Sequence, residues 1–171
     1  FVNVGYVYQL DTGVISNAGN LEITTTGTES FVDLRGNNTY TGFTSVRNGS
    51  RVIVEHDNAL GSTAGGTYID SGGTISASSQ TTNLQIPEDI TVVGSGQGGT
   101  YSGSAFTNET NSSNNHTHSY SGTITLLGDT DIELMGTLPS EISFDGEIKG
   151  TGNLTFNGSH SSDVLVLNHS N

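Results

Sequence analysis

Short apolar patches, most of them a single pair of aliphatic residues, recur along the chain. Leu21 with Ile23 is one such pair and Ile124 with Leu126 is another. Alternation with a period of two is the pattern of a β-strand that buries one face. Asn-Gly, Asp-Gly, Gly-Gly and Gly-Ser turns separate the patches. The sequence therefore predicts an all-β protein with essentially no α-helix.

Strands with two or three inward residues bury too little surface to be stable alone. They need neighbours stacked along one axis, as in a β-solenoid, where each coil supplies a thin slice of the core. With about 20 to 25 residues per coil, we expect a parallel β-helix of roughly seven or eight coils. An antiparallel β-sandwich is the alternative fold. Disorder is a second alternative, because only 31% of the residues are hydrophobic.

Landmarks near the N-terminus return near the C-terminus at one offset in the numbering. For Gly13 and Gly146 this offset is 146 − 13 = 133. The same offset relates Ile15 to Ile148, Leu21 to Leu154, Leu34 to Leu167, and Asn38 to Asn171. Residues 1–171 are therefore predicted to be a single solenoid segment that holds one full 133-residue repeat and part of the next. We expect Gly13 and Gly146 to have similar surroundings.

Residues 102–121 depart from this pattern, because the segment from Asn108 to His118 has almost nothing to bury. It is predicted to be a polar insert, either a long excursion or a solvated strand face. The glycine-rich segment from Gly94 to Gly99 lacks the Lys-Ser/Thr ending of a phosphate-binding loop and is predicted to be a turn.

The charge balance excludes several classes of partner. The chain has 17 acidic residues against four basic ones, for a net charge of −13. Nucleic acid is not expected as a partner, because binding a phosphate backbone needs clustered Lys and Arg.

Membrane insertion is not expected either, because no run of 18 apolar residues occurs. The absence of cysteine excludes disulfides and thiolate metal sites, and we predict no cofactor.

The densest acidic cluster is Asp129, Asp131 and Glu133, whose carboxylates alternate and so share one strand face. A solvated face is the plain interpretation, and a weak calcium site or a catalytic site are the alternatives. His116 and His118 are also two residues apart and are expected to project together, but two imidazoles are too few for a zinc site. The remaining histidines are distant in sequence: His56, His160 and His169.

Asn-x-Ser/Thr sequons mark possible glycosylation sites, and their place in turns and in the polar insert is expected to leave them accessible. They begin at Asn37, Asn48, Asn108, Asn111, Asn115, Asn153, Asn157 and Asn168.

Several longer motifs occur together and in order. They run from Gly36 to Gly49, from Asp57 to Ser62 followed by Gly65-Gly66-Thr67, from Tyr120 to Leu126, and from Gly150 to Phe156. In this order the chain resembles the autotransporter-associated β-strand repeat, also called the passenger-associated transport repeat, of bacterial surface proteins. The resemblance implies a right-handed parallel β-helix on the outside of a cell. Two features depart from the family pattern: Phe43 stands where a second glycine is usual, and the insert replaces a shorter link.

The first functional hypothesis is a non-enzymatic structural rod, extracellular or on the cell surface, as a segment of a bacterial adhesin or fibre. Its expected partners are coils of adjacent repeats or of an identical subunit, and a carbohydrate or host surface. A second is a polysaccharide-degrading or polysaccharide-binding β-helix similar to tailspikes and lyases, which needs converging carboxylates. A third is a carbohydrate- or protein-binding patch of exposed aromatic residues, with candidates Tyr6, Tyr8, Tyr68, Tyr101 and Tyr120.

Overall fold

The chain winds into a parallel β-solenoid with three faces. The computed structural model describes residues 6–8, 12–24, 31–78, 82–96, 103–110, 116–136 and 138–169. All regular secondary structure in these ranges is β, and every strand pair is parallel. Within the same ranges there is no helix that could cross a lipid bilayer. The predicted all-β solenoid is therefore confirmed, and the antiparallel sandwich is excluded.

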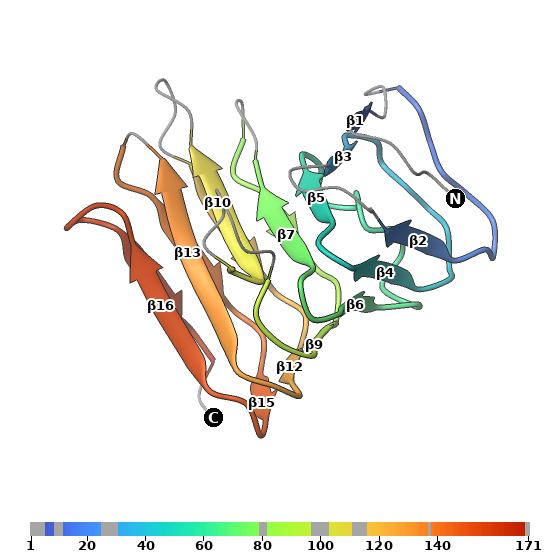
Figure 1. The fold of residues 1–171 in the computed structure, drawn as a ribbon. Helices are drawn as coiled ribbons and strands as arrows, with labels where there is room; N and C mark the ends of the chain where they lie inside the picture. Colours follow the sequence, from blue (N-terminus) through green and yellow to red (C-terminus); the bar gives the residue numbers. More distant parts are fainter. Residues whose placement is uncertain are drawn as a thin grey trace.

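Each face of the solenoid is one sheet (Figure 1). The seven-stranded sheet contains β1 (Tyr6–Tyr8), β3 (Phe31–Leu34), β5 (Arg51–Val54), β7 (Thr74–Ala77), β10 (Phe106–Thr110), β13 (Thr130–Gly136) and β16 (Leu154–Gly158). The six-stranded sheet contains β2 (Leu21–Thr24), β4 (Thr44–Arg47), β6 (Thr67–Ile69), β9 (Ile90–Val92), β12 (Ile124–Leu126) and β15 (Ile148–Gly150). The four-stranded sheet contains β8 (Gln85–Ile86), β11 (Thr117–Tyr120), β14 (Glu141–Phe144) and β17 (Val164–Leu167).

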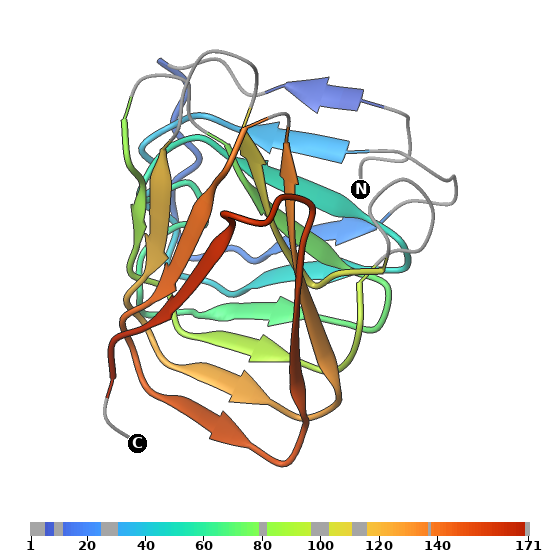
Figure 2. The ribbon, with the colours of Figure 1, turned by 90° about the vertical axis from the view of Figure 1, so that its left-hand side faces the viewer.

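The coil is right-handed. Figure 2 looks along the axis with the C-terminal coil toward the reader. The chain comes forward as it runs along β15 at the bottom, up through β16 and down through β17, which is a counterclockwise path. This sense of winding agrees with the handedness rule for parallel crossovers.

The strand registers fix the length of each coil. Leu21, Thr44, Thr67 and Ile90 stack on one another, so the first three steps in the numbering are 44 − 21, 67 − 44 and 90 − 67, each equal to 23. The next step, to Ile124, is 124 − 90 = 34, and the last, to Ile148, is 148 − 124 = 24. The six-stranded sheet therefore spans five turns, fewer than the predicted seven or eight. One coil takes 34 residues rather than 23, which leaves fewer residues for further turns.

The 133-residue offset is not a whole number of coils. Leu21 lies in β2 of the six-stranded sheet, whereas Leu154, its partner in the offset, lies in β16 of the seven-stranded sheet. Gly146 lies two residues before β15, where the equivalent residue of the first coil is Gly19 rather than Gly13. The expectation of similar surroundings is wrong, because the offset moves each landmark from one face to the next.

Stacked side chains of the same kind form the core. In the seven-stranded sheet, one inward column runs Val32, Val52, Ile75, Phe106, Ile132 and Phe156. In the six-stranded sheet another runs Ile23, Val46, Ile69, Val92 and Leu126. The central members of both columns are fully buried. Burying one such side chain contributes about 1.5 to 3 kcal/mol, so the core is the main source of stability.

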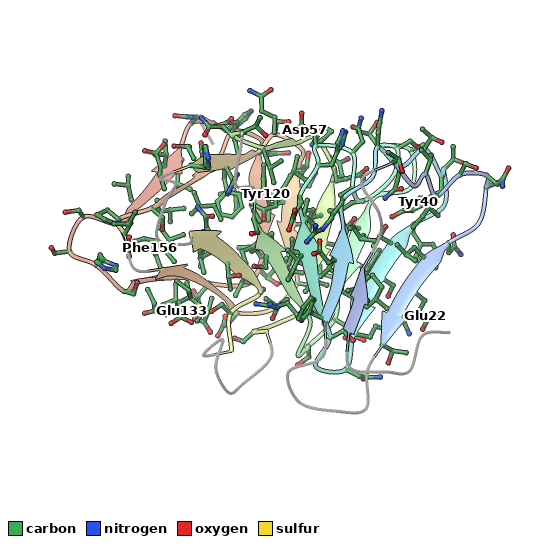
Figure 3. All side chains as sticks on the ribbon, turned by 90° about the horizontal axis from the view of Figure 1, so that it is seen from above. Glu22, Tyr40, Asp57, Tyr120, Glu133 and Phe156 are labelled. Carbon is green, nitrogen blue, oxygen red and sulfur yellow. The ribbon has the colours of Figure 1, made fainter. Side chains whose placement is uncertain are left out.

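The described part of the region predicted to be a polar insert, residues 103–110 and 116–121, contributes side chains to this core. Phe106 and Tyr120 are fully buried, and their ring centroids lie 5.2 Å apart in an edge-to-face arrangement. Phe144 completes the cluster, 5.2 Å from Phe106 and 5.4 Å from Tyr120. Figure 3 shows Tyr120 in the space between the sheets. The prediction of a solvated excursion is wrong for the described part, because period-two alternation turns Phe106 and Tyr120 inward.

A buried asparagine ties three successive coils together. Asn38 is 1% exposed, and its Oδ1 accepts a hydrogen bond of 2.9 Å from the backbone N–H of Ile15 in the preceding coil. Its Nδ2 donates a 2.7 Å bond to the carbonyl of Ala59 in the following coil. The side chain thereby satisfies buried backbone groups that lie outside the sheets. This role accounts for the second asparagine of the Gly36-Asn37-Asn38 motif.

Glycine forms a column at the corner that leads into the six-stranded sheet. Gly42, Gly65, Gly122 and Gly146 each lie two residues before a strand of this sheet. A Cβ atom at any of them would come within 3.0 Å of a backbone carbonyl oxygen of the previous coil. Gly19 heads the column and has nothing within 4 Å of such an atom. Glycine is needed here because backbone approaches backbone closely.

We predict that Gly122→Ala destabilises the fold by about 3 kcal/mol or more, because the added methyl group meets backbone that cannot move aside. Gly19→Ala is the matched control and is expected to change stability by less than about 0.5 kcal/mol. Chemical denaturation followed by circular dichroism measures both. Equal effects of the two substitutions would contradict the close-approach explanation.

Two ionisable side chains are buried within the stacked columns. Glu88 occupies the glycine column between Gly65 and Gly122 and is 0% exposed. Neither of its carboxylate oxygens has a hydrogen-bond partner among the described residues. Burial, aided by the charge of Asp89, raises the pKa of Glu88 to about 7. His118 stacks on Ile142 and is also fully buried; burial, with a smaller effect of His116, lowers its pKa to about 4.

These two groups have opposite effects on stability. Folded Glu88 holds a proton between pH 4.5 and about 7 that the unfolded chain has released, so it lowers the unfolding free energy as pH rises through this window. Unfolded His118 holds a proton between about pH 4 and 6.5 that the folded chain has released, so it raises the unfolding free energy as pH rises through that window. The two effects offset each other where the windows overlap.

Glu88→Gln removes the destabilising contribution of Glu88. We therefore predict that the unfolding free energy of this variant rises more steeply with pH than that of wild type between pH 4.5 and 6.5. Relative to its value at low pH, the difference in unfolding free energy between the variant and wild type changes by on the order of 3 kcal/mol by about pH 7. His118→Leu, which fits the aliphatic column, should show the reverse trend. Glu147→Gln, at an exposed glutamate, is the control. If the unfolding free energies of wild type and Glu88→Gln changed with pH in parallel, the raised pKa of buried Glu88 would be contradicted.

Candidate functional site

The outer face of the six-stranded sheet carries an exposed pair of aromatic rings. Tyr68 lies at the centre of β6 between two inward residues and is 50% exposed. Thr44 pairs with Thr67 and Ser45 with Tyr68, which places Phe43 beside Gly66 on the neighbouring coil. Phe43 is 39% exposed. The two rings therefore lie diagonally across adjacent coils of one flat face.

A hollow of about 260 Å³ lies between these rings. Its lining is Phe43, Ser45, Arg47, Gly65 and Tyr68. The two glycines at positions 65 and 66 bring no side chain into the space between the aromatic rings, which keeps it open. The Nε of Arg47 donates a 2.7 Å hydrogen bond to the Oγ of Ser45, which holds the guanidinium across one side of the hollow.

A second hollow, of about 210 Å³, lies between Tyr68 and the following coil. It is lined by Thr63, Ala64, Gly65, Gly66, Thr67, Tyr68, Asp89 and Thr91. Its walls are more polar than those of the first hollow, since hydroxyl groups and one carboxylate take the place of the second ring. Asp89 is fixed from the next coil, because its Oδ1 accepts a 2.7 Å bond from the N–H of Thr123.

The surroundings of both hollows are acidic. Glu22 lies on the same outer row as Ser45, and its Oε1 is 3.7 Å from the NH1 of Arg47. Asp70 follows β6, and Asp89 lines the second hollow. Arg47 is thus partly neutralised by Glu22, and an exposed pair of this kind contributes little to stability.

Among the predicted aromatic candidates, the structure exposes only Tyr68 within the described ranges. Tyr120 is 0% exposed, and burial raises its pKa. The side chains of Tyr6 and Tyr8 and the whole of Tyr101 lie outside the described residues. Phe43 was not predicted as a site residue, although it is the position where this chain departs from the glycine of the family it resembles.

The acidic side chains of Asp129, Asp131 and Glu133 link neighbouring coils through hydrogen bonds. Asp129 Oδ1 accepts hydrogen bonds of 2.9 Å from both the N–H and the Nδ2 of Asn153. Asp131 accepts a 2.8 Å bond from the Oγ of Ser95, and Glu133 a 3.0 Å bond from the Oγ of Ser104. Figure 3 shows Glu133 on the outside of the coil. Within the described ranges, no three His, Cys, Asp or Glu side chains form a group that could hold a metal ion.

The histidine pair projects to one side, as predicted from its spacing. The ring centroids of His116 and His118 are 6.4 Å apart. His118 Nδ1 accepts a 3.1 Å hydrogen bond from the N–H of Leu84, so its proton is on Nε2, which has no partner among the described residues. His116 Nδ1 lies 3.1 Å from the Oδ1 of Asn83. With His118 buried and His116 half-buried, the pair belongs to the packing of the four-stranded face.

The sequons differ in accessibility. Asn108 is 0% exposed, and its Nδ2 donates a 2.9 Å hydrogen bond to the carbonyl of Glu141. Its predicted accessibility is therefore wrong, because Asn108 takes an inward position of β10 above Leu134. Asn111 and Asn115 lie outside the described residues. The exposed sequons are Asn37, Asn48, Asn153, Asn157 and Asn168.

Comparisons with known proteins give no match to this chain among family models, curated proteins or solved structures. The fold alone assigns the chain to the class of parallel β-solenoid proteins. Membership in the autotransporter-associated repeat family stays a prediction that rests on the sequence motifs.

Because Asp129 links two coils through its hydrogen bonds to Asn153, Asp129→Ala is expected to lower the unfolding free energy by about 1 kcal/mol through loss of both bonds. Asp129→Asn keeps an acceptor oxygen and should cost less. Thermal unfolding with millimolar calcium or with chelator checks the alternative. A calcium-dependent rise in melting temperature that disappears in Asp129→Asn would support a metal site instead.

Proposed function

We propose that the chain is a non-enzymatic structural segment of an extracellular or cell-surface rod, part of a bacterial surface adhesin or fibre. The observation that carries this proposal is the open edge of the last coil. β15, β16 and β17 are each the final strand of their sheets and pair on one side only among the described residues. A row of unpaired backbone N–H and C=O groups is a template for another strand.

The apolar side chains of this coil support the same conclusion. Leu167 stacks on Phe144, which is 1% exposed, yet Leu167 itself is 53% exposed. Phe156 is only partly buried, whereas Ile132 above it is fully buried. A further coil would cover these residues and add one more slice of core. That coil is contributed by an adjacent repeat or by a second copy of the chain.

The polysaccharide-degrading alternative has weaker support. Asp131 and Glu133 are two residues apart on the outer face, and such a spacing of about 7 Å falls in the range that glycosidase carboxylates use. Both carboxylates, however, accept hydrogen bonds from serines of neighbouring coils. The polysaccharide-binding alternative has a physical basis in the outer face around Tyr68.

We expect the 171-residue chain to self-associate end to end as its concentration rises, and Leu167→Lys to weaken this association by placing a charge on the open edge. Leu127→Lys is the matched control, because Leu127 is 55% exposed but lies on the side of the coil. Sedimentation velocity and electron microscopy measure the assemblies.

Two outcomes count against the proposal. Association that responds equally to Leu167→Lys and Leu127→Lys, or a chain that stays monomeric at every concentration, contradicts stacking at this edge. Release of reducing sugar from a polysaccharide, lost in Asp131→Asn and Glu133→Gln, contradicts the non-enzymatic assignment.

A further inference from the structure

We propose that the outer face around Tyr68 is a binding site for an uncharged glycan, with one sugar ring in each of the two hollows. The inference goes beyond the structural role, since a rod needs no ligand site on its side. It rests on the two hollows, the aromatic rings beside them and the charges around them.

The exposed rings supply the apolar part of the site. Single exposed apolar residues are common on protein surfaces and need no explanation. Phe43 and Tyr68 differ because they stand on adjacent coils and bound one hollow of about 260 Å³. The apolar face of a pyranose, which carries only C–H groups, packs against an aromatic ring through dispersion and the negative charge of the ring face.

The position of Tyr68 determines how many sugar rings the face holds. Tyr68 lines both hollows, the first of which extends to the preceding coil and the second to the following coil. Residues of a glycan chain can therefore lie on either side of one aromatic ring. Both hollows lie on rigid strands and the turn of Thr63 to Gly66, which limits the entropy lost on binding.

The polar groups of the hollows suit hydroxyl groups. Arg47 donates its Nε–H to Ser45, and its guanidinium has further N–H donors. Asp89 uses Oδ1 for the N–H of Thr123, which leaves its second oxygen to accept from a sugar hydroxyl. Thr63 and Thr91 add hydroxyl groups to the second hollow. Donors and acceptors thus lie beside aromatic carbon, as the mixed surface of a sugar requires.

The charge of the region selects uncharged ligands. Asp89 lines the second hollow, and Arg47, which lines the first, already faces Glu22 at 3.7 Å. The chain as a whole carries a net charge of −13. A polyanionic glycan would be repelled by this surface, whereas a neutral one gains the ring contacts without that cost.

The experiment uses the full 171-residue chain and isothermal titration with neutral hexasaccharides, namely cellohexaose, mannohexaose and xylohexaose, and with the anionic oligogalacturonate. We expect saturable binding of at least one neutral probe and none of oligogalacturonate. Tyr68→Ala should weaken binding by about tenfold or more, because it removes the ring shared by both hollows. Tyr68→Phe keeps the ring and should retain most of the affinity.

Leu127→Ala is the matched control: it removes an exposed apolar side chain of the coil surface that lines neither hollow. Unfolding temperatures of all variants should equal that of wild type, because the altered side chains are exposed. Failure of every neutral probe to bind overturns the inference, as does binding that Tyr68→Ala leaves intact or that only oligogalacturonate shows. None of these results alters the end-to-end association measured with Leu167→Lys.

Discussion

The structure depends on how closely one coil rests on the next. At the corner before the six-stranded sheet, four coils place a glycine against a backbone carbonyl of the coil before, where a Cβ atom would not fit. The stacking distance is then set by backbone hydrogen bonds of parallel sheets. Because the contact repeats at Gly42, Gly65, Gly122 and Gly146, like side chains come to lie over like, and a thin core becomes continuous.

The acidic composition follows partly from the same geometry. Corners outside the sheets leave backbone N–H groups without a ladder partner, and a carboxylate from an adjacent coil accepts several of them. Asp89 binds the N–H of Thr123 in this way and Asp129 that of Asn153, and Asp57 binds the N–H of Gln85 in the edge strand β8. A carboxylate accepts but cannot donate, so it suits a row of orphaned donors. Part of the negative charge is thus structural, and it also shapes which ligands the surface admits.

The strands and the solenoid could be predicted from the sequence, because period-two alternation and glycine turns are local signals. The aromatic-x-Gly motifs Tyr40-Thr41-Gly42 and Tyr120-Ser121-Gly122 mark the same corner in two different coils. The coil number and the inward turn of Asn108 and His118 could not be predicted, because they depend on register across coils of unequal length. Tyr68 was a candidate from its residue type alone, and its proximity to Phe43 could be predicted only with the coil length known. Nothing in the sequence around Glu88, which lies between Pro87 and Asp89, indicates that it is buried.

The lengthened coil between β9 and β12 shows how such a scaffold can diversify. It is longer than each of the three coils before it, yet Ile124 still stacks on Ile90, and the coil that follows returns almost to the earlier length. The ladder thus absorbs an insertion within one turn and passes no distortion to its neighbours. A gene encoding this architecture can therefore gain or exchange surface decorations one turn at a time, which makes this coil a natural position for grafting a foreign peptide.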